Sequence, residues 1–400
     1  MSLHYDPITL HLGGDEIKIV ENYEIREGII NQPGAFSIRL GFGGVTRQLL
    51  NSYPPNTTFR LFVGPAPIMY GFTDGFTTGD GNGATQVTFK GRDLGARIHD
   101  AFIDSDLSFP ADRTYKELLQ AALKAVGLGD APIDKSNEAN RRSHAGKIVV
   151  QDAPTVTEGT LEDGTQGQVV VPGTSRTVYQ TITAKFGTRW GEFLKTQFDR
   201  AGLFWWADAS GGFVLSAPNP KQEPVYRIVR RRGITNAPVN VIRHSFSNDI
   251  SKRFTKCVVA GHGGGRNFGR SKNHGEWVDK EMSDLLGGDD IKPLHVHDTH
   301  ARDVKMANAM ARRKIAEANR NGYQLNYTLA GHTAPSLKGG AGSRAVWTPD
   351  TMVDVDDDEL GIKGLFYIES CTHTRSPQTE TTIHLMRPED LIFADPDAGK

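Results

Sequence analysis

A pattern of strand, turn, strand and Asp-Leu occurs twice in this chain, at two distant places. The first copy spans residues 72–94 and reads FTDGFTTGDGNGATQVTFKGRDL; the second spans residues 368–391 and reads IESCTHTRSPQTETTIHLMRPEDL. The two copies share few identical residues, but they agree in length and in the order of their parts. A repeat of this size predicts two similar β units within one polypeptide.

Length and composition set the outer limits of the fold. A chain of 400 residues suggests roughly two to four domains. Its 44 glycines and 20 prolines predict many turns and therefore much β structure. The 46 basic and 47 acidic residues give a net charge of −1, whereas a dedicated nucleic-acid-binding protein is usually basic.

The two cysteines and the apolar runs predict a protein made in the cytosol. Cys257 and Cys371 both fall in expected strands, and two thiols in so long a chain form neither a disulfide framework nor a CxxC metal site. We expect two reduced thiols in the core. No stretch approaches the roughly eighteen apolar residues of a membrane span, and the N-terminus has no signal-peptide pattern.

Residues 1–104 are predicted to form an all-β N-terminal domain, a sandwich or barrel. Alternating or nearly alternating apolar runs occupy residues 8–12, 17–20, 35–40 and 59–63. Clusters of glycine and proline separate these runs. Short strands at this spacing are typical of β-barrels.

Residues 105–216 are predicted to form an α+β middle domain. Thr114 and Glu117 form a capping box that begins a helix ending at Gly127. A second helix is expected from an N-cap at Thr188 to a stop at Gly202. A hairpin of residues 203–207 and 213–215, turning at 209–212, follows this helix.

Residues 128–180 interrupt this middle domain and are predicted to form an extended insertion or arm. The segment is rich in Gly, Thr and Asp. Residues 147–150 and 168–171 are apolar enough to pair as a hairpin.

Residues 217–400 are predicted to form a C-terminal β-barrel domain that contains one helix near 301–320. Val304, Ala307, Ala311 and Ile315 fall on one face of that helix, and Gly322 is expected to end it. Expected strands occupy residues 241–246, 254–259, 323–329, 351–355 and 366–368, and a polar, Gly-rich stretch spans 261–290.

Three histidines form the best candidate for a metal site. His295 and His297 in the sequence HVHDTH could point the same way from a strand, and His300 follows closely. The alternative is a polar loop leading into a helix cap at Asp298 or Thr299. No matched cysteine and no HExxH motif accompanies them, so we expect no metal and no cofactor.

Two charged clusters allow a binding or a purely structural interpretation. The acidic cluster comprises Asp354, Asp356, Asp357, Asp358 and Glu359, and it lacks the spacing of an EF-hand. The basic cluster comprises Arg227, Arg230, Arg231 and Arg232, with Arg266, Arg270 and Lys272. Each could be a solvated surface; the acidic one could bind calcium, and the basic one could meet an acidic partner or passing DNA.

No catalytic or nucleotide-binding motif stands out. The Gly-rich run 261–266 lacks the GK[ST] of a phosphate loop, and GxSxG is absent. Trp190, Trp205 and Trp206, with Phe193, Phe198 and Phe204, could suggest a carbohydrate platform, but their helical and strand periodicity indicates core. A glycosidase carboxylate pair has no local signature and stays open. We expect no catalytic residues and no enzyme.

Three stretches taken in order resemble one known family. The first is Tyr70-Gly71-Phe72 with residues 87–94, ending in KGRDL. The second is residues 188–218, reading TRWGEFLKTQFDRAGLFWWADASGGFVLSAP. The third begins VWTPD at 346–350, passes MVDV at 352–355 and closes with LGIKGLFYI at 360–368. Together they resemble the baseplate hub proteins of contractile-tailed bacteriophages, the Mu-like hub or late control protein D family. Residues 128–180 match no pattern of that family.

The resemblance implies a structural role in a virion. Hubs of this family are homotrimers in which each subunit carries two similar β-barrel domains, so that six barrels surround a central channel. Such a ring joins the tail tube protein to the central spike protein and allows DNA to pass during ejection. The middle domain would sit between the barrels and contact neighbours or the spike. The protein would be assembled in the host cytoplasm and reside in the tail baseplate.

Two alternatives stay open at this point. One is the hub of a contractile bacteriocin or a type VI secretion spike, although such spikes usually continue into an oligonucleotide-binding fold and a β-helix, which we do not find after Asp390. The other belongs to a different class: a tail-associated peptidoglycan hydrolase, whose activity would depend on an acidic residue.

Overall fold

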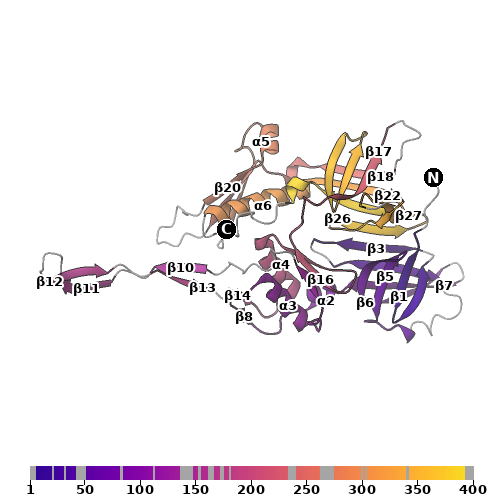
Figure 1. The fold of residues 1–400 in the computed structure, drawn as a ribbon, viewed down its shortest axis with the longest axis horizontal. Coiled ribbons are helices and arrows are strands. Elements are labelled where there is room, and N and C mark those ends of the chain that lie inside the picture. The colour runs from indigo at the N-terminus through magenta and orange to yellow at the C-terminus, as the bar shows by residue number, and fades with distance from the viewer. Residues whose placement is uncertain are drawn as a thin grey trace.

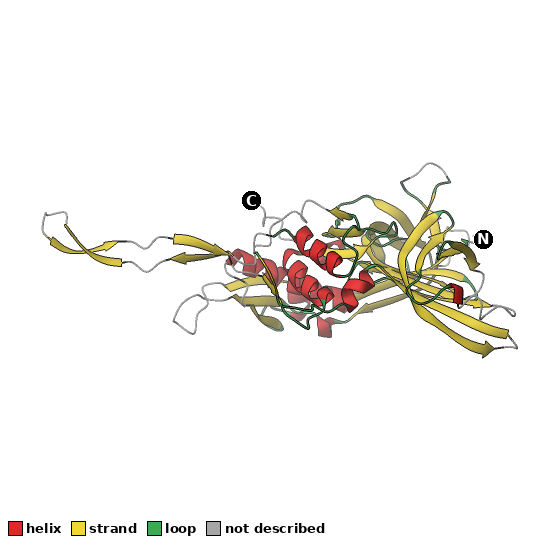
Figure 2. Ribbon diagram, turned by 90° about the horizontal axis from the view of Figure 1, so that it is seen from below, coloured by secondary structure: helices red, strands yellow, loops and turns green. Residues whose placement is uncertain are grey.

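The computed structural model describes residues 6–19, 22–30, 33–41, 51–81, 84–110, 113–135, 147–151, 155–160, 166–171, 175–179, 182–232, 240–261, 274–298, 301, 304–338 and 342–391. The molecule is mainly β, as the sequence predicts, with two helix-bearing units beside the sheets (Figures 1 and 2). Thirteen of the described strands belong to one large sheet.

The N-terminal half of that sheet curls around its own core. Its strands are β1 (Ile8–Leu12), β2 (Asp15–Ile19), β3 (Tyr23–Gly28), β4 (Ala35–Gly41), β5 (Thr58–Val63), β6 (Ala66–Gly81) and β7 (Ala84–Asp93), paired in the order β3-β4-β7-β6-β5-β1-β2. Alternate side chains of these strands, such as Leu10, Ile25, Ile38, Leu61 and Phe89, are buried in a single cluster. The alternation seen in the sequence therefore marks the inner face.

The first copy of the repeat is the long hairpin of β6 and β7. Gly91, in the KGRDL ending, lies where a side chain has no room: a Cβ there would be 2.6 Å from the Phe36 ring and 2.8 Å from the Phe72 carbonyl oxygen. The chain then enters helix α2 (Gly95–Asp100). That short helix was not expected in an all-β segment, because its six residues are too few to establish a helical period.

The C-terminal half curls around a second core. Its strands are β17 (Pro224–Arg230), β18 (Val241–Asn248), β22 (Tyr323–Ala330), β25 (Thr351–Asp357), β26 (Ile362–Arg375) and β27 (Thr379–Met386), with the small pair β23 (Thr333–Pro335) and β24 (Arg344–Val346). The pairing order is β17-β25-β26-β27-β22-β18. Tyr226, Tyr327, Trp347, Ile368 and Cys371 are among its buried residues.

A side chain bridges the two outer strands of this half. Asn240 directly precedes β18, and its amide accepts a hydrogen bond from the Val229 N–H of β17 at 3.2 Å. The same amide donates to the Arg227 carbonyl at 3.0 Å. Because a carboxamide carries the same donor and acceptor as a peptide group, Asn240 takes the place of a neighbouring strand.

The two halves are joined edge to edge. β3 pairs antiparallel with the second part of β26, from Ser370↔Gly28 to Arg375↔Tyr23. The resemblance placed the middle domain between the two β domains; the structure instead joins the two sheets directly, and the helices lie to one side of that junction (Figure 1).

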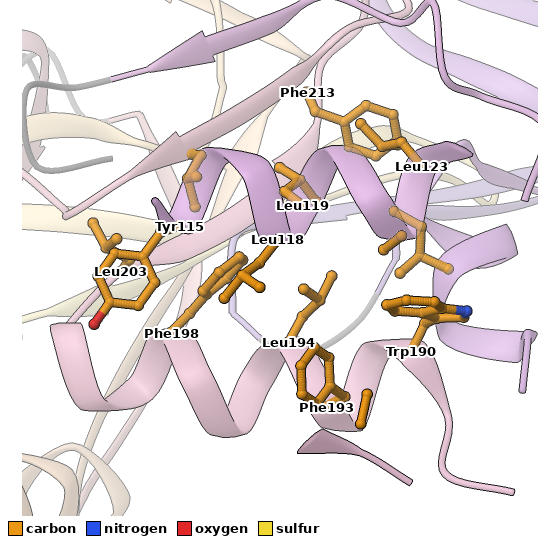
Figure 3. Close-up of a cluster of buried hydrophobic side chains, with 14 of the residues drawn as sticks. Tyr115, Leu118, Leu119, Leu123, Trp190, Phe193, Leu194, Phe198, Leu203 and Phe213 are labelled. Carbon is orange, nitrogen blue, oxygen red and sulfur yellow. The ribbon is translucent and has the colours of Figure 1, made fainter. Parts of the chain in front are cut away.

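The middle unit is a small α+β layer with its own core. It contains β8 (Leu107–Phe109), α3 (Tyr115–Ala125), β9 (Ile133–Lys135), β14 (Ile182–Ala184), α4 (Trp190–Ala201), β15 (Phe204–Ala207) and β16 (Phe213–Ser216). Apolar faces of α3 and α4 pack together through Leu118, Leu119, Leu194 and Phe198 (Figure 3). The capping box of Thr114 and Glu117 is confirmed.

One predicted helix start is wrong. The N-cap of α4 is Arg189, which makes no side-chain capping bond, and not Thr188. The Thr188 carbonyl instead accepts a hydrogen bond from the Ile103 N–H, so this residue belongs to the loop that holds α2 and α4 together. The stop at Gly202, in the left-handed conformation, is confirmed.

The arm consists of two separate ribbons at one end of the molecule (Figures 1 and 2). β10 (Lys147–Gln151) pairs with β13 (Ser175–Tyr179), and β11 (Thr155–Thr160) pairs with β12 (Gln166–Val171). An extended insertion is thus observed, but the expected pairing of 147–150 with 168–171 is wrong. Residues 166–171 pair with the nearer run 155–160, since a shorter loop costs less entropy to close. Residues 147–151 then pair with the more distant run 175–179.

A second α/β unit is inserted between β18 and β22. It contains a 3₁₀ turn at Ile250–Lys252, then β19 (Lys256–Gly261), β20 (His274–Val278), α5 (Lys280–Leu286), β21 (Pro293–Asp298) and α6 (Val304–Gly322). Ala307, Ala311 and Ile315 of α6 are buried against β19 as predicted. Gly275 lets β20 approach α6, since a Cβ there would lie 2.3 Å from the Ala307 and Asn308 backbone.

Three expectations in this unit are corrected. Val304 is 49% exposed, because it begins the helix and lies beyond the strands that cover the other three positions. The strand expected from residue 254 begins at Lys256. Residues 274–278 and 280–286, expected within a polar loop, form β20 and α5, where the Asp279 carboxylate caps the helix by accepting from the Met282 N–H.

Candidate functional site

The histidine cluster does not form a metal site among the residues described. His295 and His297 lie on β21 with exposed side chains, and His300 falls outside the described residues. No group of three or more metal-ligating side chains converges in the described part of the chain. The HxH pattern here reflects the outward face of an amphipathic strand.

The acidic and basic clusters neutralise each other. β17 runs parallel to β25, with Arg227↔Asp354 and Arg230↔Asp357 in register. Arg227 lies 3.4 Å from Asp354, and Arg231 pairs with Asp356 and lies 3.2 Å from Asp358. The Arg231 guanidinium lowers the pKa of Asp356. The clusters therefore do not present a cation-binding or a DNA-binding surface in these two strands.

The ion pairs between β17 and β25 form a ladder of charges. Other members of the basic cluster do not take part in it. Arg232 is exposed, and Arg266, Arg270 and Lys272 fall outside the described residues, as do residues 262–266 of the Gly-rich run. Sequence reasoning treated the acidic and basic clusters separately, because nothing local indicates that strands more than a hundred residues apart pair in parallel.

The centre of the charge ladder is buried. Asp357 is 0% exposed and accepts hydrogen bonds from the Tyr327 hydroxyl at 2.8 Å and from the Glu359 and Leu360 N–H groups at 2.9 and 3.0 Å. Burial and this carboxylate raise the pKa of Tyr327. A carboxylate so fully satisfied by the protein is a structural group and has no free lone pair directed at a ligand.

The aromatic residues on α4 are core, as their periodicity predicts. Trp190, Phe193 and Phe198 are each at most 5% exposed within the middle unit. Trp205 stacks on His99 of α2 at 5.0 Å between ring centroids, and Trp206 and Phe204 pack against the end of the C-terminal sheet. Burial lowers the pKa of His99.

In both Asp-Leu endings of the repeat, the leucine is buried and the aspartate is hydrogen-bonded to the protein. Leu94 and Leu391 are 2% and 5% exposed. The Asp93 carboxylate accepts from the Gly34 and Gly95 N–H groups at 2.5 and 2.8 Å, and its burial raises the pKa of Asp93 to about 7. Asp390 accepts from Arg387 Nε at 2.7 Å, and burial raises the pKa of its carboxyl as well.

The junction of the two halves carries a buried polar cluster that sequence reasoning missed. The Thr381 hydroxyl donates to the Gly331 carbonyl at 2.9 Å, so it accepts from Nδ1 of His332 at 2.9 Å and of His373 at 3.1 Å. The bonding pattern assigns both imidazoles a proton on Nδ1. His332 Nε2 is then free to accept from the Tyr23 hydroxyl at 2.7 Å.

Burial and the neighbouring His373 lower the pKa of His332 to about 2. Asp6 holds the loop next to this cluster by accepting from the His332 and Thr333 N–H groups at 2.8 and 3.0 Å. His332, His373 and Thr381 are each 0% exposed. What the cluster does is fix the position of one β half against the other.

Comparisons with known proteins identify the fold. A comparison with protein-family models finds no match, and a search of curated protein sequences finds none either. Among solved structures, the chain is similar to the 43 kDa tail protein of prophage MuSo2 from Shewanella oneidensis, with 15% identity, a TM-score of 0.72, and coverage of 96% of this chain and 100% of that one. It is similar also to the tail protein from Neisseria meningitidis MC58, with 17% identity, a TM-score of 0.71, and coverage of 98% and 100%.

A third similarity is to a chain in the Francisella PdpA–VgrG complex in its lidded form, with 10% identity and a TM-score of 0.52; it covers 96% of this chain and 53% of that one. The chain therefore has the fold of the two tail proteins over nearly all of its length. No helix among the described residues is long and apolar enough to cross a membrane.

Proposed function

We propose that this protein is a structural hub of a phage-type contractile tail baseplate. Three copies would form a ring that joins the tail tube to the central spike and leaves a channel for DNA. The similarity of fold to two tail proteins over nearly the whole chain supports a tail role, and the junction of β3 with β26 carries the more specific proposal.

The junction matters because it places two curled sheets side by side in one subunit. Each has its own buried core, and each contains one copy of the repeated hairpin. A subunit that supplies two similar faces can bridge a threefold spike and a sixfold tube. Rigid attachment of one half to the other is what such a bridge requires, and the Tyr23–His332 cluster supplies it.

The same proposal makes the protein a non-enzymatic virion component, assembled in the host cytoplasm. Its net charge of −1 is compatible with a channel wall past which DNA moves without sticking. A peptidoglycan hydrolase would need acidic residues that can act on a substrate. Asp354, Asp356 and Asp357 instead form ion pairs with arginines.

A second candidate is the hub of a bacteriocin or a type VI secretion spike. The similarity to a chain in the PdpA–VgrG complex favours it at the level of fold. The two candidates share the ring and differ in what the ring carries, so the assembly state tests both.

Native mass spectrometry over a range of protein concentrations, with electron microscopy of the same samples, tests the proposal. We expect trimers that appear as rings with a sixfold outline, and no release of fragments from purified peptidoglycan. A monomer at all concentrations that cleaves peptidoglycan would overturn it in favour of the hydrolase. The concentration series is needed because dilution alone can dissociate a ring.

A further inference from the structure

One edge of the large sheet is an open strand with an apolar residue on its surface. β18 pairs with β22 on one side, and the described residues provide no backbone partner for Ser245, Phe246 and Ser247 on the other. Phe246 is 40% exposed. A long open edge is a template for pairing with another chain, and proteins usually protect it.

A second open edge lies on the outer part of β6. Residues 66–72 of β6 pair with β5, whereas Gly75 to Gly79 have only β7 beside them among the described strands. Thr77, Thr78 and Gly79 are exposed. Nothing in the described chain covers this stretch.

The second half of the molecule shows how such a stretch can pair with another strand. β26 has the same plan as β6: its first part pairs with β25, and its second part continues past a bulge. The bulge skips Glu369 in β26 and Asp74 in β6. Beyond the bulge, β26 is covered by β3, and this is the junction of the two halves.

β18 is the counterpart of β3. β3 lies beside β4, which lies beside β7; β18 lies beside β22, which lies beside β27. The two halves can be matched residue by residue, starting at the bulge and following the paired strands outward. Gly79 then corresponds to Thr374, and Ser245 corresponds to Glu24. The open edge of β18 therefore has the place that β3 has in the junction, and the open part of β6 has the place of β26.

The geometry points to a junction between copies: we propose that β18 of one subunit pairs antiparallel with residues 75–79 of β6 in the next, in the register of the internal junction. Since Thr374 faces Glu24 within the chain, Gly79 faces Ser245 of the neighbouring copy. This inference rests on the proposed ring and names the strands that close it.

The burial of side chains supports this assignment. Phe246 is the counterpart of Ile25, which is 0% exposed beneath the internal junction. Pairing β18 with another copy would bury Phe246 as Ile25 is buried, and burying apolar surface stabilises the contact. A head-to-tail contact between different edges also closes into a ring when its rotation divides a full turn.

A disulfide between the facing positions tests the register. The double variant Gly79→Cys with Ser245→Cys places both thiols at surface positions, and a Cβ at Gly79 meets no atom within 4 Å. Directly opposed residues bring Cβ atoms to about 4.5–5.5 Å, close enough for a disulfide after small adjustments. After oxidation we expect covalent dimers and trimers on a non-reducing gel, with no larger species. Mixing the two single variants should give dimers only.

Two matched pairs complete the experiment. Glu24→Cys with Thr374→Cys is the internal counterpart and should form its disulfide within one chain. Thr78→Cys with Ser245→Cys is slipped by one residue, which turns one thiol to the opposite face of the sheet, so it should give at least tenfold less covalent oligomer. The native thiols of Cys257 and Cys371 are both buried and add little background.

The outcomes separate this inference from the proposed function. A trimer that forms the internal disulfide but no disulfide between copies would overturn the strand pairing and leave the hub standing. Equal yields from the matched and the slipped pairs would overturn the register. A protein that is monomeric at every concentration would overturn the proposed hub itself.

Discussion

The Tyr23 hydroxyl donates a hydrogen bond of 2.7 Å to Nε2 of His332, 309 positions further along the chain. Tyr23 lies on β3 and is 5% exposed, and His332 is 0% exposed in the loop after β22. The bond crosses the junction between the two β halves. Its strength therefore reports on how firmly one half is attached to the other.

Replacing Tyr23 with phenylalanine should weaken that attachment. The ring keeps its packing, but His332 Nε2 loses its donor inside the protein. An unsatisfied buried acceptor costs about 1–3 kcal/mol of unfolding free energy, which chemical denaturation can measure. Tyr70→Phe is the matched control, because no hydrogen bond to the Tyr70 hydroxyl is described; it should change stability by less than about 0.5 kcal/mol. Equal effects of the two variants would argue against a role for the bond.

The free energy of unfolding should decrease as the pH falls below the pKa of an exposed histidine. The pKa of His332 is lowered to about 2 in the folded protein, so between about pH 6.5 and pH 2 the unfolded chain binds a proton that the folded chain does not. The free energy of unfolding then decreases with falling pH, and by pH 5 this one group removes about 2 kcal/mol.

Comparing pH 7 with pH 5 in the wild type and in His332→Gln isolates this contribution from that of the carboxylates. The glutamine variant should lose about 2 kcal/mol less between the two pH values. His295→Gln should follow the wild type, because the side chain of His295 is exposed. A wild-type pH dependence unchanged by His332→Gln would show that another group is responsible.

Substitution by alanine should lower the free energy of unfolding far more at Asp357 than at its neighbour Asp358. Asp357→Ala removes the acceptor of the Tyr327 hydroxyl and leaves Arg230, 3.6 Å away, without its buried partner. Breaking a buried ion pair costs about 3–5 kcal/mol. The Asp358 side chain is 38% exposed, so its pairs with Arg231 and Lys363 are worth about 0–1 kcal/mol. Urea unfolding of both variants gives the comparison, and similar midpoints would refute it.

The same ladder of charges shows what a sequence can and cannot predict. Thr114 and Glu117 are three positions apart, and local geometry alone determines their capping box, which is why it was predicted correctly. The strands of both halves were predicted mostly within a few residues for a similar reason, since alternation is a local signal. Arg231 and Asp356 are 125 positions apart, and only the fold shows that they meet.

Two other differences between the predicted and the observed structure have local causes. α5 has seven residues and follows glycines, so the Asp279 cap was its single signal. In the arm, apolar runs of equal strength could pair in more than one way, and side-chain pattern alone does not choose among them. The junction cluster of Tyr23, His332 and Thr381 gave no sequence signal at all, because none of its members forms a motif.

Arg253 should be essential to the second α/β unit. It is 0% exposed and donates to Asn319 at 3.0 Å, to Asp279 at 3.4 Å and to Glu281 at 2.7 Å, so it connects α5 with α6. Arg253→Met would leave the buried Asp279 without its cation, at a cost of about 3–5 kcal/mol. Hydrogen exchange should then speed up in α5 and α6. Lys252→Met, at a side chain 53% exposed, should leave exchange unchanged.

Removing residues 345–400 should abolish ring formation, whereas removing the arm should not. The truncation deletes β25, β26 and β27, so β3 keeps only β4 beside it and the C-terminal half loses the centre of its sheet. The core of the N-terminal half takes its buried residues from positions 8–89 and should persist, as circular dichroism can verify. Replacing residues 147–179 with a short Gly-Ser linker removes ribbons whose strands pair only with each other in the described chain, so that variant should assemble normally. Sedimentation and electron microscopy of both variants compare the two deletions. Rings of unchanged size from the truncated chain would mean that the second β half is not a building unit of the ring, and that each subunit does not supply two similar faces.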